Sequence, residues 1–229
     1  MNSLEILPVK TNKKKEKSDI PEPIPQHPFT MCLIAPTASG KTVTLVNLIY
    51  RFYKHNFDEI IYISPTVLID ETLENNVTKD PDITKIHEEE DLKNIDTMLE
   101  EIVKEQKESP KKDRKKLLIV LDDMIGHFKR HSTLDNLPAL SRHYDISFII
   151  CCQSFNPLPT RLRKNASHYL IYRLYNKADL DCINKEVGCN YENFEQHYKN
   201  CIDEKYSFMF LDNKKMKIYK RFVNLLWEK

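Results

Sequence analysis

Three short stretches of this chain carry residue types that suit the chemistry of a nucleoside triphosphate. The first is the loop 35–42, which reads APTASGKT. Backbone N–H groups of such a loop, together with the dipole of a following helix, hold phosphate oxygens. Gly40 lets the phosphates approach the backbone, Lys41 brings a positive charge to the β- and γ-phosphates, and the Thr42 hydroxyl is a ligand for Mg²⁺. The predicted nucleotide-binding residues are Ala35, Pro36, Thr37, Ala38, Ser39, Gly40, Lys41 and Thr42.

The scarcity of glycine makes this loop stand out. The chain has 3 glycines in 229 residues, and one of them stands directly before Lys41. A chance Gly-Lys-Thr is therefore a weak explanation for a motif that follows an apolar strand and opens a helix. The usual pattern also has glycine at the first position, where this chain has Ala35, so we expect a departure from the usual backbone there.

The second and third stretches supply carboxylates and an amide. Asp122 and Asp123 follow the apolar run 117–121, and Gln153 follows the apolar run 146–152. In a phosphate-loop protein the first carboxylate completes the Mg²⁺ site, and the second acts as the base for an attacking water. The amide of Gln153 is suited to sensing the γ-phosphate or aligning that water. Taken alone, these polar residues would be ordinary strand ends.

Four arginines are candidates for stabilising charge in the transition state. Arg142 precedes the strand that ends at Gln153, Arg161 and Arg163 follow it, and Arg173 ends the next apolar strand. Such an arginine finger can come from a neighbouring subunit. Each arginine could equally be a solvated surface charge, and we favour Arg142.

Short apolar strands alternate with helices along the chain, which predicts an α/β fold with a mainly parallel sheet covered by helices on both faces. The expected strands are 29–36, 58–65, 117–123, 145–153 and 168–174, and the expected helices are 41–55, 88–107, 134–143, 177–187 and 192–201. A C-terminal β-hairpin is expected from 206–211 and 216–220, and 66–87 is expected to be irregular. All three polar stretches follow strands, at the edge where such sheets bind ligands.

The N-terminal segment and the composition of the chain bear on its domain organisation and on its class. Residues 1–28 combine a lysine cluster with the run PEPIPQHP, which predicts a flexible basic, proline-rich tail before a domain at 29–229. The formal net charge is +1, which argues against coating nucleic acid by bulk charge. No signal peptide or membrane span is expected. The aromatic residues of the last segment are interpreted as core rather than base-stacking residues: Tyr191, Phe194, Tyr198, Tyr206, Phe208 and Phe210.

Together these motifs resemble the FtsK–HerA superfamily of DNA-pumping P-loop NTPases (RecA/ASCE-like), and within it the poxvirus-type DNA packaging ATPases of large DNA viruses and virophages. The likeness rests on LIAPTASGKT, IIYISPT, LLIVLDDM, RHYDISFIICCQSFNPLP and the strand before Arg173. It implies ATP and Mg²⁺ as cofactors, with Thr42 and Asp122 as metal ligands. It also implies Asp123 as catalytic base, Gln153 as sensor and Arg142 as finger.

The same resemblance implies a biological setting. The active form would be a homo-oligomeric ring, a hexamer, that threads double-stranded DNA into a capsid and contacts capsid proteins. Its location would be the host cytoplasm (virus factory) or the virion. The motifs leave two other functions open: a P-loop nucleoside or nucleotide kinase, for which no arginine-rich lid is evident, and an ATP-binding assembly switch with little turnover.

Overall fold

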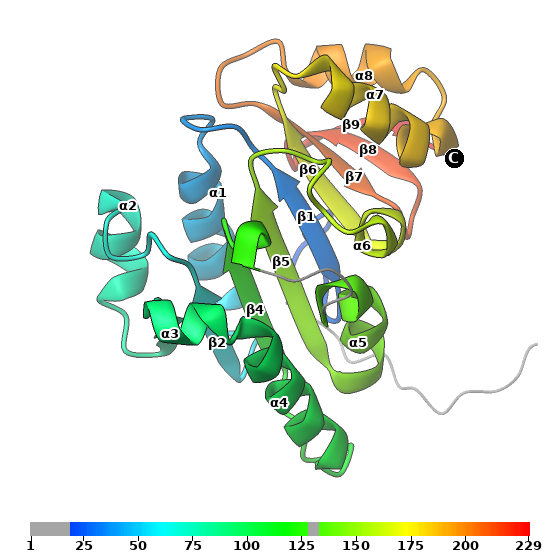
Figure 1. The fold of residues 1–229 in the computed structure, drawn as a ribbon. Coiled ribbons are helices and arrows are strands. Elements are labelled where there is room, and N and C mark those ends of the chain that lie inside the picture. Colours follow the sequence, from blue (N-terminus) through cyan, green and yellow to red (C-terminus); the bar gives the residue numbers. More distant parts are fainter. Residues whose placement is uncertain (1–18, 128–132) are drawn as a thin grey trace, which may run out of the picture.

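In a computed structural model of the chain, which describes residues 19–127 and 133–229, nine strands form one sheet in the order β3-β2-β4-β5-β1-β6-β7-β8-β9 (Figure 1). The strands are β1 (Thr30–Ile34), β2 (Glu59–Ile63), β3 (Ile83–Ile86), β4 (Leu117–Asp122), β5 (Ile146–Cys152), β6 (His168–Tyr172), β7 (Phe208–Asp212), β8 (Lys217–Lys220) and β9 (Asn224–Glu228). Strands β1 to β6 are mutually parallel. The remaining three are antiparallel. The predicted α/β class and mainly parallel sheet are therefore confirmed.

Helices connect the parallel strands and account for most of the other regular structure. They are α1 (Lys41–Leu48), α2 (Glu71–Leu73), α3 (Glu89–Lys93), α4 (Ile95–Glu108), α5 (Leu137–Tyr144), α6 (Thr160–Asn165), α7 (Lys177–Glu186) and α8 (Phe194–Cys201). The first two continue as π-helical segments, η1 (Ile49–Tyr53) and η2 (Glu74–Thr78). Shorter 3₁₀ turns are η3 (Ile125–His127), η4 (Thr133–Asn136) and η5 (Gly188–Asn190).

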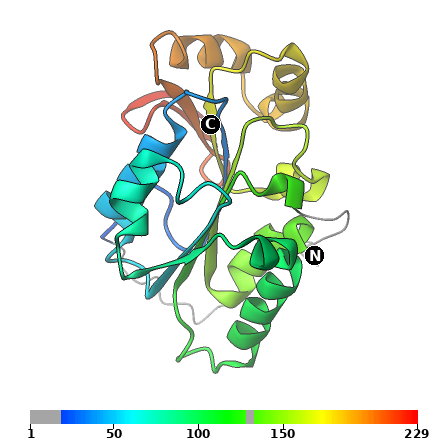
Figure 2. The same ribbon diagram turned by 60° about the vertical axis from the view of Figure 1, so that its left-hand side comes forward.

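Both faces of the sheet are covered, as predicted. Successive side chains of a strand point to opposite faces, so β1 contributes to two cores. Met31 and Leu33 pack with α1, whereas Cys32 and Ile34 pack on the side of α4 and α5. All four side chains are fully buried. Figure 2 shows the blue and cyan helices on one side of the sheet and the green helices on the other.

The order of the strands brings the polar strand ends together. β5 lies between β1, which leads into the loop 35–42, and β4, which ends in Asp122. Because these strands run parallel, their carboxyl ends meet at one edge of the sheet, where the loop, Asp123 and Gln153 follow them.

Several elements differ from the sequence-based prediction. Residues 66–87 are not irregular throughout, because they contain α2, η2 and the edge strand β3. The expected single helix over 88–107 is divided at Asn94 into α3 and α4. The expected C-terminal hairpin is present as β7 and β8 and is extended by β9.

The part of the predicted N-terminal tail that the structure describes, residues 19–28, packs against the domain. Ile20 and Ile24 are 4% and 5% exposed and belong to the core on the α1 face. The Tyr53 hydroxyl donates to the carbonyl of Pro25, which also fixes this segment against η1. The lysine cluster lies outside the described residues. No helix among residues 19–127 and 133–229 is long and apolar enough to cross a membrane.

Candidate nucleotide-binding site

The loop 35–42 joins the carboxyl end of β1 to the start of α1. The Ala35 N–H donates to the carbonyl of Cys152 at 2.9 Å, so the strand pairing with β5 continues into the loop. Within the loop, Ala38 (φ 61°) and Gly40 (φ 95°) have a left-handed backbone conformation. Alanine at the first position is therefore compatible with the loop, because the glycine-like conformation lies three and five residues further along.

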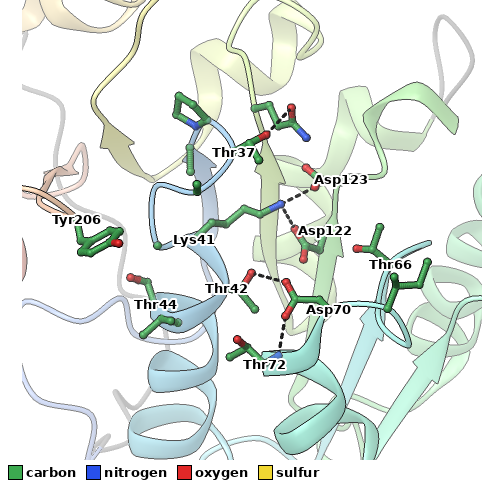
Figure 3. A pocket seen from close by; sticks show the side chains of 17 residues that line it. Thr37, Lys41, Thr42, Thr44, Thr66, Asp70, Thr72, Asp122, Asp123 and Tyr206 are labelled. Atoms are coloured by element: carbon green, nitrogen blue, oxygen red, sulfur yellow. Dashed lines mark hydrogen bonds and ion pairs between the residues drawn. The ribbon is translucent and has the colours of Figure 1, made fainter.

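Lys41 lies between the two predicted carboxylates. Its Nζ is 2.7 Å from Asp122 Oδ1 and 2.6 Å from Asp123 Oδ2 (Figure 3). Burial is the largest single influence and opposes the charged form of the lysine, but the charge of Asp122 together with the hydrogen bonds to Asp122 and Asp123 outweighs it, and the pKa of Lys41 is raised above its ordinary value. The side chain is 14% exposed. This lysine is thus a shielded, permanently charged group at the end of the loop.

The two carboxylates occupy different environments. Asp122 is 2% exposed, and its Oδ2 accepts a hydrogen bond from the Tyr62 hydroxyl at 2.7 Å. Burial raises the pKa of Asp122, and Lys41 partly offsets that effect. Asp123 has a left-handed backbone (φ 56°) and is the more exposed of the two. Strained backbone of this kind often occurs at functional sites.

A third carboxylate, which the sequence did not indicate, approaches from β2's side of the sheet. Asp70 Oδ2 accepts a hydrogen bond from the Thr42 hydroxyl at 3.2 Å. Its Oδ1 accepts from the backbone N–H groups of Thr72 and Leu73, which caps α2. The available signal was the acidic cap followed by Glu71 and Thr72, which is typical of a helix start.

Gln153 lies at the same edge, as predicted. It follows β5 and lines the same cavity as Lys41 and both carboxylates. The Thr37 hydroxyl donates to Gln153 Oε1 at 3.5 Å, a long contact between the loop and the amide. The structure therefore brings together the loop, the carboxylate pair and Gln153.

These groups surround a cavity of about 930 Å³. Its lining includes the exposed aromatic ring of Tyr206 (Figure 3), and this ring lies beside Gly40. A Cβ at Gly40 would be 3.2 Å from Tyr206 Cδ1, so the ring lies against the loop. Tyr206 is 55% exposed, whereas the other five aromatic residues of the last segment are buried. Our interpretation of Tyr206 as a core residue is therefore wrong.

The arginines do not converge on this cavity within one subunit. Arg142 lies on α5, and it lines a different cavity together with Thr30, at the amino end of β1. Arg173 follows β6 and donates to the carbonyl of Ile202. Arg163 contacts Cys182 Sγ and Glu186.

The donor set fits a nucleotide with its cation. Ser39 Oγ and Asp123 Oδ1 are buried without a hydrogen-bond partner among the described residues. The oxygens of Thr42, Asp122 and Asp70 gather at the start of α1, and hard oxygen ligands are those that Mg²⁺ prefers. The loop, the lysine and these oxygens are thus suited to a Mg²⁺-bound triphosphate.

Strand order, loop and carboxylates together define a P-loop NTPase fold, and solved structures agree. The genome packaging NTPase B204 from Sulfolobus turreted icosahedral virus 2, in complex with ATP-γS, superposes with a TM-score of 0.61 at 16% identity, over 86% of this chain and 98% of that one. The pCW3 conjugation coupling protein TcpA superposes with a TM-score of 0.60 at 14% identity, over 86% of this chain and 61% of that one. The EccC ATPases 2 and 3 of Thermomonospora curvata superpose with a TM-score of 0.55 at 13% identity, over 86% of this chain and 37% of that one.

Within this class the sequence identifies a particular family. Residues 20–203 match the family described as Poxvirus A32 protein, and the chain belongs to that family. A curated relative, the DNA packaging protein OPG160 of Variola virus, is 27% identical over 175 residues, which cover 70% of this chain and 58% of the relative. The chain thus spans less than two thirds of that relative's length. The resemblance inferred from the motifs is confirmed.

Proposed function

We propose that this protein hydrolyses ATP at the loop 35–42 and uses the energy to move double-stranded DNA into a viral capsid. The observation that carries the proposal is the convergence of Lys41, Asp122 and Asp123 in one cavity beside the loop. Family membership and the packaging roles named for B204 and OPG160 support the choice of DNA as substrate.

Nucleotide binding would begin with an exchange of partners at Lys41. The lysine is charged and paired with two carboxylates. Phosphate oxygens that enter the loop compete with Asp122 and Asp123 for its ammonium group. Release of Asp123 frees a carboxylate at the position where a base is needed. The same movement would therefore bind the phosphates and prepare hydrolysis.

Thr42 and Asp122 would hold Mg²⁺, with Asp70 oriented toward the same hydroxyl. When bound, the cation neutralises phosphate charge as it develops in the transition state. Asp123 Oδ1, which has no partner among the described residues, would accept the proton of the attacking water. Gln153 would align that water from the end of β5.

Arg142 would act on the nucleotide of a neighbouring copy. It lies at the amino edge of the sheet, whereas the loop lies at the carboxyl edge. Its own nucleotide is therefore out of reach, and a finger role requires a ring, which we propose to be a hexamer. The ring would contact capsid proteins and work in the host cytoplasm or in the virion.

A triplex-displacement assay tests the translocase. A duplex carries a bound third strand, and a motor that moves along the duplex removes that strand when ATP is present. We expect displacement by the wild-type chain with ATP, and none by Lys41→Ala. ATP hydrolysis without displacement, in the presence of assembled rings, would contradict the translocase and leave an ATPase of another kind. Phosphate transfer to a nucleoside would instead identify a kinase.

A further inference from the structure

A second cavity, of about 270 Å³, lies at the opposite edge of the sheet from the loop 35–42. Its lining includes Thr30, the first residue of β1, and Ser167, which directly precedes β6. The loop leaves the other end of β1. Because β1 has five residues, the two cavities are separated by about 16 Å along the strand direction. The second cavity is therefore not part of the nucleotide site of its own subunit.

Three cations from separate elements surround this cavity. Arg142 comes from α5, Lys164 from α6 and Lys214 from the turn between β7 and β8. None of the described residues that line it is acidic. Desolvation lowers the pKa of Lys214, and the charge of Arg142 acts in the same direction against the pull of Asp212. Lys214 and Arg142 thus repel each other, although the attraction of Asp212 on Lys214 is the stronger of the two charge effects.

Two hydroxyl groups in the lining also need a partner. Thr30 and Ser141 are 2% and 1% exposed, and neither Thr30 Oγ1 nor Ser141 Oγ has a hydrogen-bond partner among the described residues. Buried polar groups are usually satisfied, and leaving one unpaired costs free energy. The cations are exposed, so the hydroxyls lie deeper than the charges. Cations at the rim and hydroxyl donors beneath them form a complementary set for a tetrahedral oxyanion.

We propose that this cavity is a second phosphate-binding site, built from Arg142, Lys164 and Lys214 with the Thr30 and Ser141 hydroxyls. A phosphate group would neutralise the three charges and accept from both hydroxyls. The phosphate can belong to a nucleotide held by a neighbouring copy or to the backbone of DNA. Only this choice of source rests on the proposed function; the phosphate site itself rests on the cavity.

Binding of inorganic phosphate tests the site directly. The full chain carries Lys41→Ala, so that the loop 35–42 does not retain phosphate, and no nucleotide is added. Equilibrium dialysis with radiolabelled inorganic phosphate measures binding to this parent and to a triple variant with Arg142→Gln, Lys164→Gln and Lys214→Gln. The matched control removes three exposed charges from α7 and α8 instead: Lys177→Gln, Lys185→Gln and Lys199→Gln.

We expect the parent and the control to bind about one phosphate per chain. The triple variant should bind it at least about tenfold more weakly, because charge-assisted hydrogen bonds are lost. Ser141→Ala, a change of one buried oxygen, should weaken binding without loss of a cooperative melting transition. A parent that binds no phosphate, an equal loss in both triple variants, or an unchanged affinity in Ser141→Ala would overturn the site.

Two further measurements identify the source of the phosphate. If DNA supplies it, the triple variant loses affinity for a labelled duplex, and the salt dependence of binding becomes shallower by about one unit for each lost contact. If a neighbouring nucleotide supplies it, duplex affinity stays unchanged, and mixtures of the triple variant with Asp123→Asn subunits recover ATP hydrolysis. The dialysis does not depend on hydrolysis, so failure of the motor hypothesis would leave its result intact.

Discussion

Lys41 Nζ lies 2.6 Å from Asp123 Oδ2, so the residue expected to meet the phosphates is paired with the residue expected to activate water. Asp122 Oδ1, at 2.7 Å, completes the arrangement. One lysine thus links the loop after β1 to the end of β4. In the proposed mechanism this pairing would couple nucleotide entry to release of the base, because phosphate and carboxylate compete for the same ammonium group.

Asp123→Asn should separate binding from hydrolysis. Asparagine tolerates the left-handed backbone at this position, so the loop geometry should persist. Loss of the base should lower kcat by roughly a hundredfold or more, whereas the Kd for ATP should stay equal or fall, because one competitor for Lys41 loses its charge. Steady-state kinetics and equilibrium titration with ATP measure the two quantities. Loss of ATP binding would instead assign Asp123 a structural or metal-binding role.

Tyr62→Phe should affect turnover through the orientation of Asp122. The variant removes the hydroxyl that donates to Asp122 Oδ2 and leaves the ring in place. We expect lower kcat together with a stability loss of about 1 to 2 kcal/mol. The matched control is Tyr53→Phe, another fully buried tyrosine, whose hydroxyl bonds the Pro25 carbonyl away from the site. If both variants lose stability but keep wild-type kcat, Tyr62 has no positioning role.

Tyr206 should contribute a stacking surface for the base of the nucleotide. Its ring is exposed and lines the cavity beside Gly40. Tyr206→Ala should raise KM for ATP about fivefold or more, because stacking on an aromatic ring is lost, and Tyr206→Phe should not. Tyr175→Ala is the control, since Tyr175 is 83% exposed and does not line the cavity. Equal KM values for Tyr206→Ala and the control would exclude the stacking role.

His168 should make the fold sensitive to mild acid. Burial, with the charges of Lys214 and Lys215, holds the pKa of His168 well below its ordinary value. The unfolded chain takes up this proton near pH 6.5, so it binds more protons than the folded chain at lower pH. The free energy of unfolding should therefore fall below about pH 6.5, by up to about 1.4 kcal/mol per pH unit from this residue.

Urea denaturation at several pH values measures this dependence. His168→Phe keeps an aromatic ring where His168 stacks on Phe210, but removes the titrating group. We expect its unfolding free energy to depend less on pH between about 5 and 7 than that of the wild type. Identical pH profiles for the two chains would show that His168 is not the source.

The sequence was sufficient to predict that the central residues of the candidate site lie together, because they belong to contiguous motifs at strand ends. Lys41 follows β1 by a short loop, and Asp122 ends β4. Strands as apolar as β1 and β4 are typical of a buried parallel sheet, in which their carboxyl ends lie at the same edge. The fold class and most strands followed from the same apolar runs. The short edge strands β3 and β9 were missed, because four or five residues with little burial carry a weak pattern.

Residues that reach the site through tertiary packing could not be predicted in this way. Asp70 meets Thr42 across 28 positions of sequence, from the N-cap of a helix of three residues. Tyr206 comes from the turn before β7, and its spacing resembles that of the buried aromatic residues around it. Arg142 was predicted to act as a finger on a neighbouring subunit, and its place on α5, beside the amino end of β1, is compatible with that role but could not be derived from the sequence.

Steady-state ATP hydrolysis, with and without double-stranded DNA, tests the central claim most directly when wild type and Lys41→Ala are measured together. We predict hydrolysis by the wild-type chain that DNA stimulates strongly, and the loss of both basal and stimulated rates in Lys41→Ala. Undiminished hydrolysis by Lys41→Ala would contradict the assignment of the loop as the nucleotide site. Hydrolysis that depends on Lys41 but is indifferent to DNA would contradict the DNA motor and leave the nucleotide site in place.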